Sequence, residues 1–417
     1  MQVHEKIQNL IKKGVQIPNP QSVQIGAEVN TDRISGDGVV IYSGCKIFGS
    51  SMLILRGVEL GYEAPVTIEN CQIGPQVELK GGYFNQSVFL KQVIVASGAN
   101  IREGTIMEEE SRAAHTVGLK QTILFPFVTL GSLINFCDCL MSGGTGNKDH
   151  SEVGSSYIHF NYTPNEDKAT PSLIGDVPRG VMLNQPPIFL GGQGGLVGPC
   201  RLEFGTIIAA GSICRKDQFQ TGQLVFEKPA KSGNIPFIRG MYPGIKRILI
   251  NNIVYIANLA ALRQWYSQVR SQFISNEFPK GLLESLNEKL LLAMDERIKR
   301  LKAFSEKMPN SVTTYQTVAK KHDSSQIIQQ QREFYEKWTE LEEYFESLGK
   351  VTVKEAARDA FLEKIHSGIS KAGKDYISVI RDLNREDKEQ GSQWLQAIVD
   401  HITTGALKII PTFKNSK

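Results

Sequence analysis

The chain has 417 residues, of which 41% are hydrophobic and 22% charged, and its formal net charge is +4 at pH 7. This length leaves room for two or three domains, and the charge is too small to indicate a nucleic-acid partner. No stretch approaches the ~20 apolar residues of a membrane-spanning helix, and the N-terminal residues lack the apolar segment of a secretory signal. We therefore expect a globular cytoplasmic protein that binds neither nucleic acid nor membrane.

Residues 1–20 are predicted to hold a short capping helix. Four aliphatic side chains between Ile7 and Val15 share one helical face, and two prolines follow them. In a solenoid the first coil exposes unpaired backbone groups, which a helix of this kind can cover.

The pattern of residues 188–217 is the strongest structural signal. This stretch reads IFLGGQGGLVGPCRLEFGTIIAAGSICRKD, and small residues separate Leu190, Leu196, Leu202 and Ile208, which are six positions apart. A period of six fits neither an α-helix nor an alternating strand. It is typical of hexapeptide-repeat β-helices, in which each short strand contributes one aliphatic side chain to a shared core.

From residue 23 onward, shorter pieces rich in glycine, valine and isoleucine repeat at less regular intervals. We therefore predict that residues 21–217 form an all-β left-handed parallel β-helix of about seven or eight coils, each of roughly 18 residues. Its left hand would be an exception to the right-handed crossover rule. Polar or Pro/Gly-rich loops at residues 141–156 and 163–187 are expected to interrupt it.

The remainder of the chain has a different composition. Residues 218–246 carry three prolines and several glycines, which predicts an irregular connector. In residues 247–417 apolar side chains recur at helical spacing in about five stripes. This pattern predicts an all-α helical domain whose stripes form the core of a bundle rather than a cofactor site.

Six cysteines are confined to the first 214 residues, and no two of them form a CxxC pair. This spacing predicts neither a zinc site nor a redox motif, and disulfide bonds are not expected in the cytoplasm. We interpret the cysteines as small core residues and expect no bound metal. They are Cys45, Cys71, Cys137, Cys139, Cys200 and Cys214.

Six short motifs follow one another in an order that a known family shares. They are AAHTVG (113–118), FNYTPNEDK (160–168), LIGD (173–176), FLGG (189–192), LVGP (196–199) and GTIIAAGSICRKD (205–217). They resemble the C-terminal acetyltransferase domain of the bacterial bifunctional enzyme that is both N-acetylglucosamine-1-phosphate uridyltransferase and glucosamine-1-phosphate acetyltransferase. The resemblance implies a hexapeptide-repeat acyltransferase of UDP-N-acetylglucosamine-type metabolism, with acetyl-CoA as the acyl donor and a homotrimeric assembly.

The chain also resembles proteins described as UDP-N-acetylglucosamine pyrophosphorylase-related. However, the uridyltransferase half of the family carries a Gly-rich nucleotide loop of the type LAAGxGTRM, and this sequence contains none. The strand–helix alternation that could host such a loop is also missing. We therefore expect no pyrophosphorylase activity from this chain by itself, because the nucleotidyltransferase domain is absent.

Acetyl transfer to an amine needs a base, a donor for the oxyanion and a positioned thioester. By resemblance His115 is the base, and histidine suits the role because its ordinary pKa lies near neutrality. His159 is the main rival, since it would share a strand face with Asn161. A lone histidine is otherwise more often structural than catalytic.

The resemblance also implies an acceptor site. Asn161 and Tyr162 match the family's Asn–Tyr pair, and Lys168 matches a lysine that follows it, although the spacing here is one residue longer. Arg102 and Arg112 precede the histidine and are candidates to bind a phosphate. Each arginine has an equally good interpretation as a solvated charge at the edge of the β-helix.

Small residues and a basic pair near residue 217 match the part of the family that holds the acyl carrier. Arg215 and Lys216 are candidates to meet the diphosphate of coenzyme A, although a basic pair at the end of a solenoid also serves solubility. Backbone groups that would line the pantetheine groove belong to Gly191, Gly192, Ala209 and Ala210.

Three functions remain open from the sequence. The first is an acyl-CoA-dependent transfer, by resemblance of an acetyl group, to an amino sugar phosphate or nucleotide sugar. The second is a non-catalytic sugar-nucleotide-binding or scaffolding solenoid, which the long interval between His115 and Asn161 favours. The third is a partner subunit of a separate nucleotidyltransferase.

Overall fold

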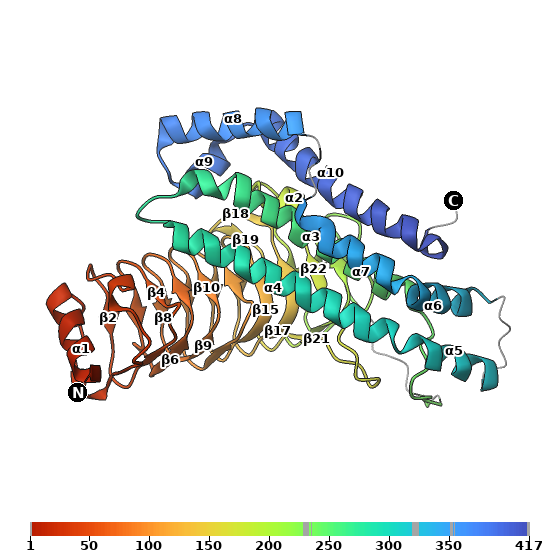
Figure 1. The fold of residues 1–417 in the computed structure, drawn as a ribbon, viewed down its shortest axis with the longest axis horizontal. Helices are drawn as coiled ribbons and strands as arrows, with labels where there is room; N and C mark the ends of the chain where they lie inside the picture. The colour runs from red at the N-terminus through yellow and green to blue at the C-terminus, as the bar shows by residue number, and fades with distance from the viewer. Residues whose placement is uncertain are drawn as a thin grey trace.

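The computed structural model describes residues 2–227, 233–234, 236–318, 325–350, 353 and 355–414. A solenoid of short parallel strands is followed by a layer of helices that lies alongside it (Figure 1). The predicted fold class, a left-handed parallel β-helix followed by an all-α region, is confirmed. Among the described residues, none of the helices combines the length and the apolar content that crossing a bilayer requires.

The solenoid is a prism with three faces. Face 1 is one sheet of ten parallel strands among the described residues. Its strands are β2 (Val40–Ile41), β5 (Glu59–Leu60), β8 (Glu78–Leu79), β11 (Ile94–Val95), β14 (Arg112–Ala113), β16 (Thr129–Leu130), β20 (Glu152–Val153), β23 (Phe189–Leu190), β26 (Ile207–Ile208) and β28 (Leu224–Val225).

A second sheet bends around the other two faces. Face 2 contains β1 (Gln24–Ile25), β3 (Lys46–Phe48), β6 (Val66–Glu69), β9 (Gly82–Asn85), β12 (Ala99–Ile101), the first halves of β15 (Gly118–Leu124) and β17 (Asn135–Met141), then β21 (Ile158–Phe160), β24 (Gly195–Val197) and β27 (Ile213–Cys214). Face 3 contains β4 (Leu53–Ile54), β7 (Gln72–Ile73), β10 (Val88–Phe89), β13 (Ile106–Met107), the second halves of β15 and β17, then β22 (Ser172–Ile174) and β25 (Arg201–Leu202).

The hexapeptide period sets the core of the prism. Leu190, Leu196, Leu202 and Ile208 are all buried, as the sequence predicts, because each strand of two or three residues turns one aliphatic side chain inward. The number of coils was predicted wrongly, since face 1 alone has ten strands. Residues paired on face 1 are 18 positions apart in some coils but 16 or 23 in others, and this irregularity hides the period.

The ends and loops of the solenoid carry their own elements. Helix α1 (Gln2–Lys13) lies at the first coil, where the Lys6 ammonium donates to the carbonyl oxygens of Gly26, Ala27 and Val29 at 3.1, 2.6 and 2.7 Å. The predicted polar loops do interrupt the coils. They form the antiparallel hairpin β18–β19 (Gly144–Gly146 and Asp149–His150), a loop between β21 and β22, and the single-turn helix α2 (Val177–Gly180).

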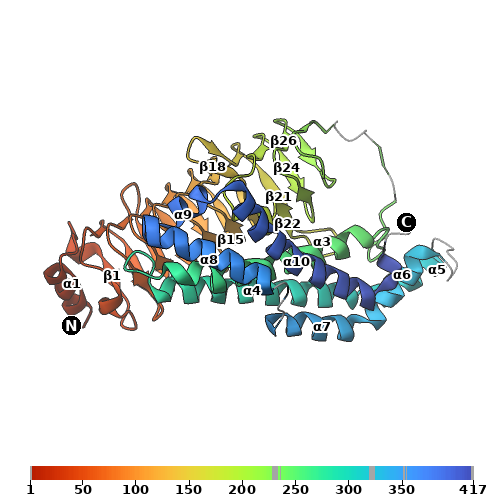
Figure 2. The same ribbon diagram turned by 90° about the horizontal axis from the view of Figure 1, so that it is seen from above.

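The helical layer covers face 3. Helix α4 (Lys280–Ser305) packs on β7 and β10, and α3 (Lys246–Gln268) packs on β22. Helices α8 (Glu355–Ala372) and α10 (Arg385–Ile409) lie on the far side of this layer (Figures 1 and 2). The other helices in the described residues are α5 (Met308–Thr317), α6 (Gln326–Glu336), α7 (Trp338–Glu346) and α9 (Tyr376–Asp382).

All five predicted apolar stripes fall on helices, but the helical layer has more elements than predicted. The stripe around Phe334 and Phe345 is divided between α6 and α7, which are separated at Lys337. Helices α5 and α9 are short and were missed. One continuous hydrophobic core includes residues of both the solenoid and the helices, so the two parts are packed as one body.

Two buried ion pairs cross between the solenoid and the helices. Asp138 of β17 lies 2.7 Å from Nη2 of Arg297 on α4, with 7% and 2% of the two side chains exposed. Glu109 lies 2.5 Å from Nη2 of Arg270, which follows α3. Buried charges are stable only when they are paired, so these contacts fix how the helical layer sits on face 3.

Candidate functional site

His115 and Glu63 meet on the edge between faces 1 and 2. His115 follows β14, its side chain is 60% exposed, and its Nε2 lies 3.2 Å from Oε2 of Glu63. The backbone N–H of Ser97 donates to the same carboxylate oxygen at 3.0 Å. The interaction with Ser97 is the largest cause that lowers the pKa of Glu63. The carboxylate is therefore ionised at neutral pH and orients the imidazole, which is how a third group holds a catalytic base.

The sequence predicts His115 but not Glu63, which is 52 residues earlier in the chain. Glu63 reaches the histidine because the turn from β5 to β6 is longer than the corresponding turns of the next coils. The long turn GYEAP was the available signal. It could be recognised only once the coil boundaries around it were known.

The small residues of the predicted carrier groove lie on the same edge as His115. Gly191 and Gly192 follow β23, and Ala209 and Ala210 follow β26, which are the third and fourth strands after β14 on face 1. Neighbouring strands are ~4.8 Å apart, so these residues lie roughly 14 to 19 Å from the level of His115 along the solenoid. The edge between these two levels is a continuous surface of one chain.

His159 is placed where it cannot meet a substrate. Its side chain is buried on β21, with Nδ1 2.6 Å from the carbonyl oxygen of Cys137 and Nε2 2.8 Å from Oγ of Ser172. The carbonyl accepts only, so Nδ1 carries the proton and Nε2 accepts from the serine hydroxyl. Burial lowers the pKa of His159 to about 4. The structure thus argues against His159 as a base and favours a neutral core histidine.

Asn161, Tyr162 and Lys168 belong to the loop between β21 and β22, on the edge between faces 2 and 3. The Tyr162 ring is exposed, and the Lys168 ammonium lies 5.9 Å from its centre. The helical layer holds this loop, since Lys307 donates to the carbonyl oxygen of Asn165 at 2.7 Å and Arg297 to that of Lys168 at 3.3 Å. Face 2 therefore separates the predicted acceptor residues from His115 of the same chain.

The basic residues of the prediction are divided between the two edges. Arg112 points outward from face 1, three residues before His115. Arg102 follows β12 and is exposed on the edge between faces 2 and 3, with Nη2 4.0 Å from Sγ of Cys137. Arg215 and Lys216 follow β27 and are also exposed on the edge between faces 2 and 3. In one chain, Arg112 alone among these four lies beside the His115 edge.

An exposed apolar ladder flanks the His115 edge, and the sequence analysis missed it. Phe189, Ile207 and Leu224 are direct partners on neighbouring strands of face 1, and they are 40%, 44% and 58% exposed. On face 2, Ile158 and Phe160 are also at least 40% exposed. Contiguous exposed apolar side chains of this kind mark interaction surfaces.

No metal centre accompanies these residues. Within the described ranges, His, Cys, Asp and Glu side chains nowhere gather in groups of three or more that could hold an ion. All six cysteines are free and buried, as small core residues are.

The curated relatives of this chain include proteins named Bifunctional protein GlmU. The protein from Thermotoga maritima is 29% identical over 213 residues, which are 51% of this chain and 42% of that protein. The protein from Pelobacter propionicus is 26% identical over 210 residues, covering 50% and 40% of the two chains. The resemblance to the bifunctional enzyme is thus confirmed for about half of the chain, and the chain spans less than half the length of these relatives.

No protein-family model matches this chain. Two solved structures align with it at 12% identity: LpxA from Acinetobacter baumannii, with a TM-score of 0.20 over 67% of this chain and 95% of that one, and a UDP-N-acetylglucosamine acyltransferase from Campylobacter jejuni, with a TM-score of 0.17 over 66% and 93%. At such low TM-scores these alignments carry no argument about function.

Proposed function

We propose that this protein is an acyl-CoA-dependent acetyltransferase that acts on an amino sugar phosphate or a nucleotide sugar. The observation that carries the proposal is the pair of His115 and Glu63, which lies on the same edge as the small residues of the carrier groove. The sequence relatives support the sugar substrate class.

In this proposal the acceptor amine attacks the acetyl thioester and His115 accepts the proton that the amine loses. The C–N bond forms, the C–S bond breaks, and the leaving thiolate takes the proton back from His115. Nε2 is held by Glu63, so Nδ1 is the nitrogen that faces the amine. The ionised carboxylate stabilises the imidazolium that forms, as the third member of a catalytic triad does. When bound, acetyl-CoA supplies the activated acetyl group.

The geometry of the edge fits a long, thin carrier arm. Side chains at positions 191, 192, 209 and 210 are hydrogen atoms or methyl groups. Ala210 is exposed, and Gly192 and Ala209 are partly so. An arm laid along this edge would meet backbone and methyl groups at the levels of β26 and β23, and the exposed side chain of Leu133 beside His115.

We further propose that the acceptor site is completed by a neighbouring copy in a homotrimer. Within one chain face 2 separates His115 from Asn161, Tyr162 and Lys168. In a cyclic trimer each copy presents different surfaces to its two neighbours. The His115 edge of one copy can therefore face the edge between faces 2 and 3 of the next copy, which carries the acceptor residues. The apolar ladder beside the His115 edge provides the surface that such a neighbour would bury.

A non-catalytic binding or scaffolding solenoid is the second candidate, and one observation favours it. The loop that holds Asn161 and Tyr162 is fixed by the helical layer through Lys307 and Arg297. In this alternative the loop serves to attach the helical layer to the solenoid and does not bind an acceptor.

His115→Ala tests the catalytic proposal. We expect the mutation to lower kcat/KM for acetyl transfer about 10²- to 10⁴-fold, because it removes the general base. The assay is thiol release from acetyl-CoA, with glucosamine-1-phosphate and UDP-linked amino sugars as acceptors. His150→Ala, which removes a histidine of the β18–β19 hairpin, is the matched control. Wild-type turnover in His115→Ala would overturn the assignment of the base. No turnover and no acetyl-CoA binding by the unmutated protein would favour the scaffold.

Ile207→Glu tests the trimer. We expect the unmutated protein to have three times the 46.3 kDa mass of the chain in solution, and the mutation to give monomers at micromolar concentration, because it places a charge at the centre of the apolar ladder. Light scattering after size-exclusion chromatography measures both masses. Thr129→Glu adds the same charge on face 1 outside the ladder and should leave the trimer intact. A monomeric unmutated protein would rule out the trimer.

A further inference from the structure

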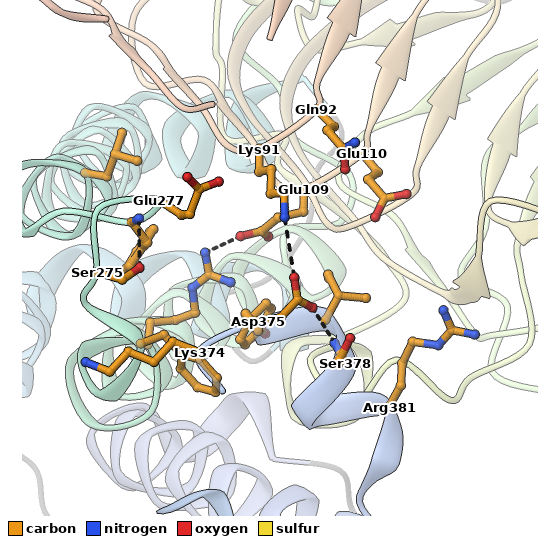
Figure 3. A pocket seen from close by; sticks show the side chains of 16 residues that line it. Lys91, Gln92, Glu109, Glu110, Ser275, Glu277, Lys374, Asp375, Ser378 and Arg381 are labelled. Atoms are coloured by element: carbon orange, nitrogen blue, oxygen red, sulfur yellow. Dashed lines mark hydrogen bonds and ion pairs between the residues drawn. The ribbon is translucent and has the colours of Figure 1, made fainter. Parts of the chain in front are cut away.

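A cavity of about 520 Å³ lies between the solenoid and the helical layer, away from the His115 edge. Its volume is in the range of small-molecule binding sites. The solenoid contributes the turns after β10 and β13, and the helical layer contributes the segment after α3 and the start of α9. Figure 3 shows Lys91 and Glu109 of the solenoid on one side of the cavity, and Asp375 and Arg381 of the helical layer on the other.

Arg270 lines the cavity and has unused hydrogen-bonding capacity. Its side chain is 1% exposed, and its guanidinium carbon lies 3.8 Å from the ring centre of Tyr376 and 4.5 Å from that of Phe278. Nη2 binds Oε1 of Glu109, whereas Nε and Nη1 have no hydrogen-bond partner. Oε2 of Glu109 also has none. Buried polar groups without hydrogen-bond partners cost free energy. A ligand that accepts from Arg270 and donates to Glu109 would remove this cost.

The charges around the cavity balance, and several of them are already paired. Lys91 lies 3.4 Å from Asp375, and Glu277 pairs with Arg56 outside the cavity. The lining contains four cationic and four anionic side chains: Lys91, Arg270, Lys374 and Arg381, and Glu109, Glu110, Glu277 and Asp375. A lining without net charge does not favour a simple anion or a simple cation.

We propose that this cavity binds a small zwitterion, a molecule that carries both an ammonium group and an anionic group. The anionic group accepts from one of the free N–H groups of Arg270, and the ammonium group donates to Oε2 of Glu109. Both contacts are charge-assisted hydrogen bonds, which are stronger than neutral ones. The chemistry fits an α-amino acid or an amino sugar phosphate. The site is independent of the acetyl transfer proposed for His115.

Binding to the full-length protein tests the proposal. The probes are the standard α-amino acids and glucosamine-1-phosphate, measured by calorimetry and by the shift of the thermal unfolding midpoint. We expect at least one probe to bind with a Kd below about 1 mM. Ethanolamine, lactate and inorganic phosphate each keep one charged group, and we expect them to bind at least about tenfold more weakly.

Substitutions locate the binding. Arg270→Lys keeps the charge beside Glu109 but removes the guanidinium and with it the Nε and Nη1 donors at their positions, so we expect it to abolish binding. Arg381→Ala, at the exposed mouth, should weaken binding about fivefold, even if Arg270→Lys fails to fold. Arg385→Ala removes an exposed arginine outside the cavity and should change nothing. Binding that is retained in His115→Ala and lost in Arg270→Lys belongs to this cavity.

Three outcomes would overturn the proposal. One is that no zwitterion binds at about 10 mM, in which case the cavity holds water only. Another is that the singly charged analogues bind as tightly as the zwitterion. The third is that binding persists unchanged in the folded substitution variants of Arg270 and Arg381.

Discussion

Arg297→Met is expected to lower the free energy of unfolding by about 3 to 5 kcal/mol, because it leaves a buried carboxylate without its partner. Asp138 is 7% exposed, and its Oδ1 lies 2.7 Å from Nη2 of Arg297. The same arginine donates to the carbonyl oxygen of Lys168 at 3.3 Å, so the mutation also releases the loop between β21 and β22. Denaturant titration followed by circular dichroism measures the loss.

The double mutation Asp138→Asn with Arg297→Met separates charge burial from packing. Without a buried charge most of the lost stability should return, since replacing both members of a buried pair is often close to neutral. Asn also tolerates the left-handed backbone of position 138, where φ is 60°. Arg300→Met is the control, because this neighbour pairs with Glu296 at the surface and should cost less than about 1 kcal/mol. A loss of less than about 1 kcal/mol in Arg297→Met alone would contradict the prediction.

The fold was predictable where one period held over several coils. From Leu190 to Ile208 each sixth residue is an aliphatic side chain that the structure buries. Earlier coils vary in length because turns such as that of Glu63 and the hairpin β18–β19 are inserted at the edges. A longer turn shifts the next strand along the sequence, but that strand still places its aliphatic side chain in the core. The fold is therefore kept while the sequence period is lost.

The site was predictable only where a motif could be matched. The motif AAHTVG identified His115, but its partner Glu63 lies in an earlier coil and no local pattern joins the two. His159 was proposed because it shares a strand face with Asn161, but its partners are Cys137 of the preceding coil and Ser172 on face 3 of its own coil. The pair of Asp138 and Arg297 joins residues 159 positions apart. This last contact follows from the docking of α4 on the solenoid, which periodicity does not encode.

Gly191→Ala is expected to destabilise the protein by about 3 kcal/mol, the upper part of the usual range for overpacking. A Cβ at this position would lie 2.3 Å from N and 2.6 Å from Cα of Ala210 in the next coil. These are backbone atoms, so no side chain can rotate to make room. The N–H of Gly191 already donates to the carbonyl oxygen of Ile208 at 2.8 Å, and the two coils can separate only by stretching this hydrogen bond. Thermal and denaturant unfolding measure the loss.

Gly211→Ala on the same edge is the matched control for this prediction. Its Cβ would meet nothing within 4 Å, but its φ is +72°, so we expect only the left-handed backbone cost of about 1 to 2 kcal/mol. A loss in Gly191→Ala no larger than in Gly211→Ala would show that the coils can separate freely. Because the stacking of coils alone requires a glycine at 191, weaker acetyl-CoA binding in Gly191→Ala is no evidence for a carrier groove. Ala210→Phe is the informative change, since Ala210 is exposed and a ring there blocks the edge without entering the stack.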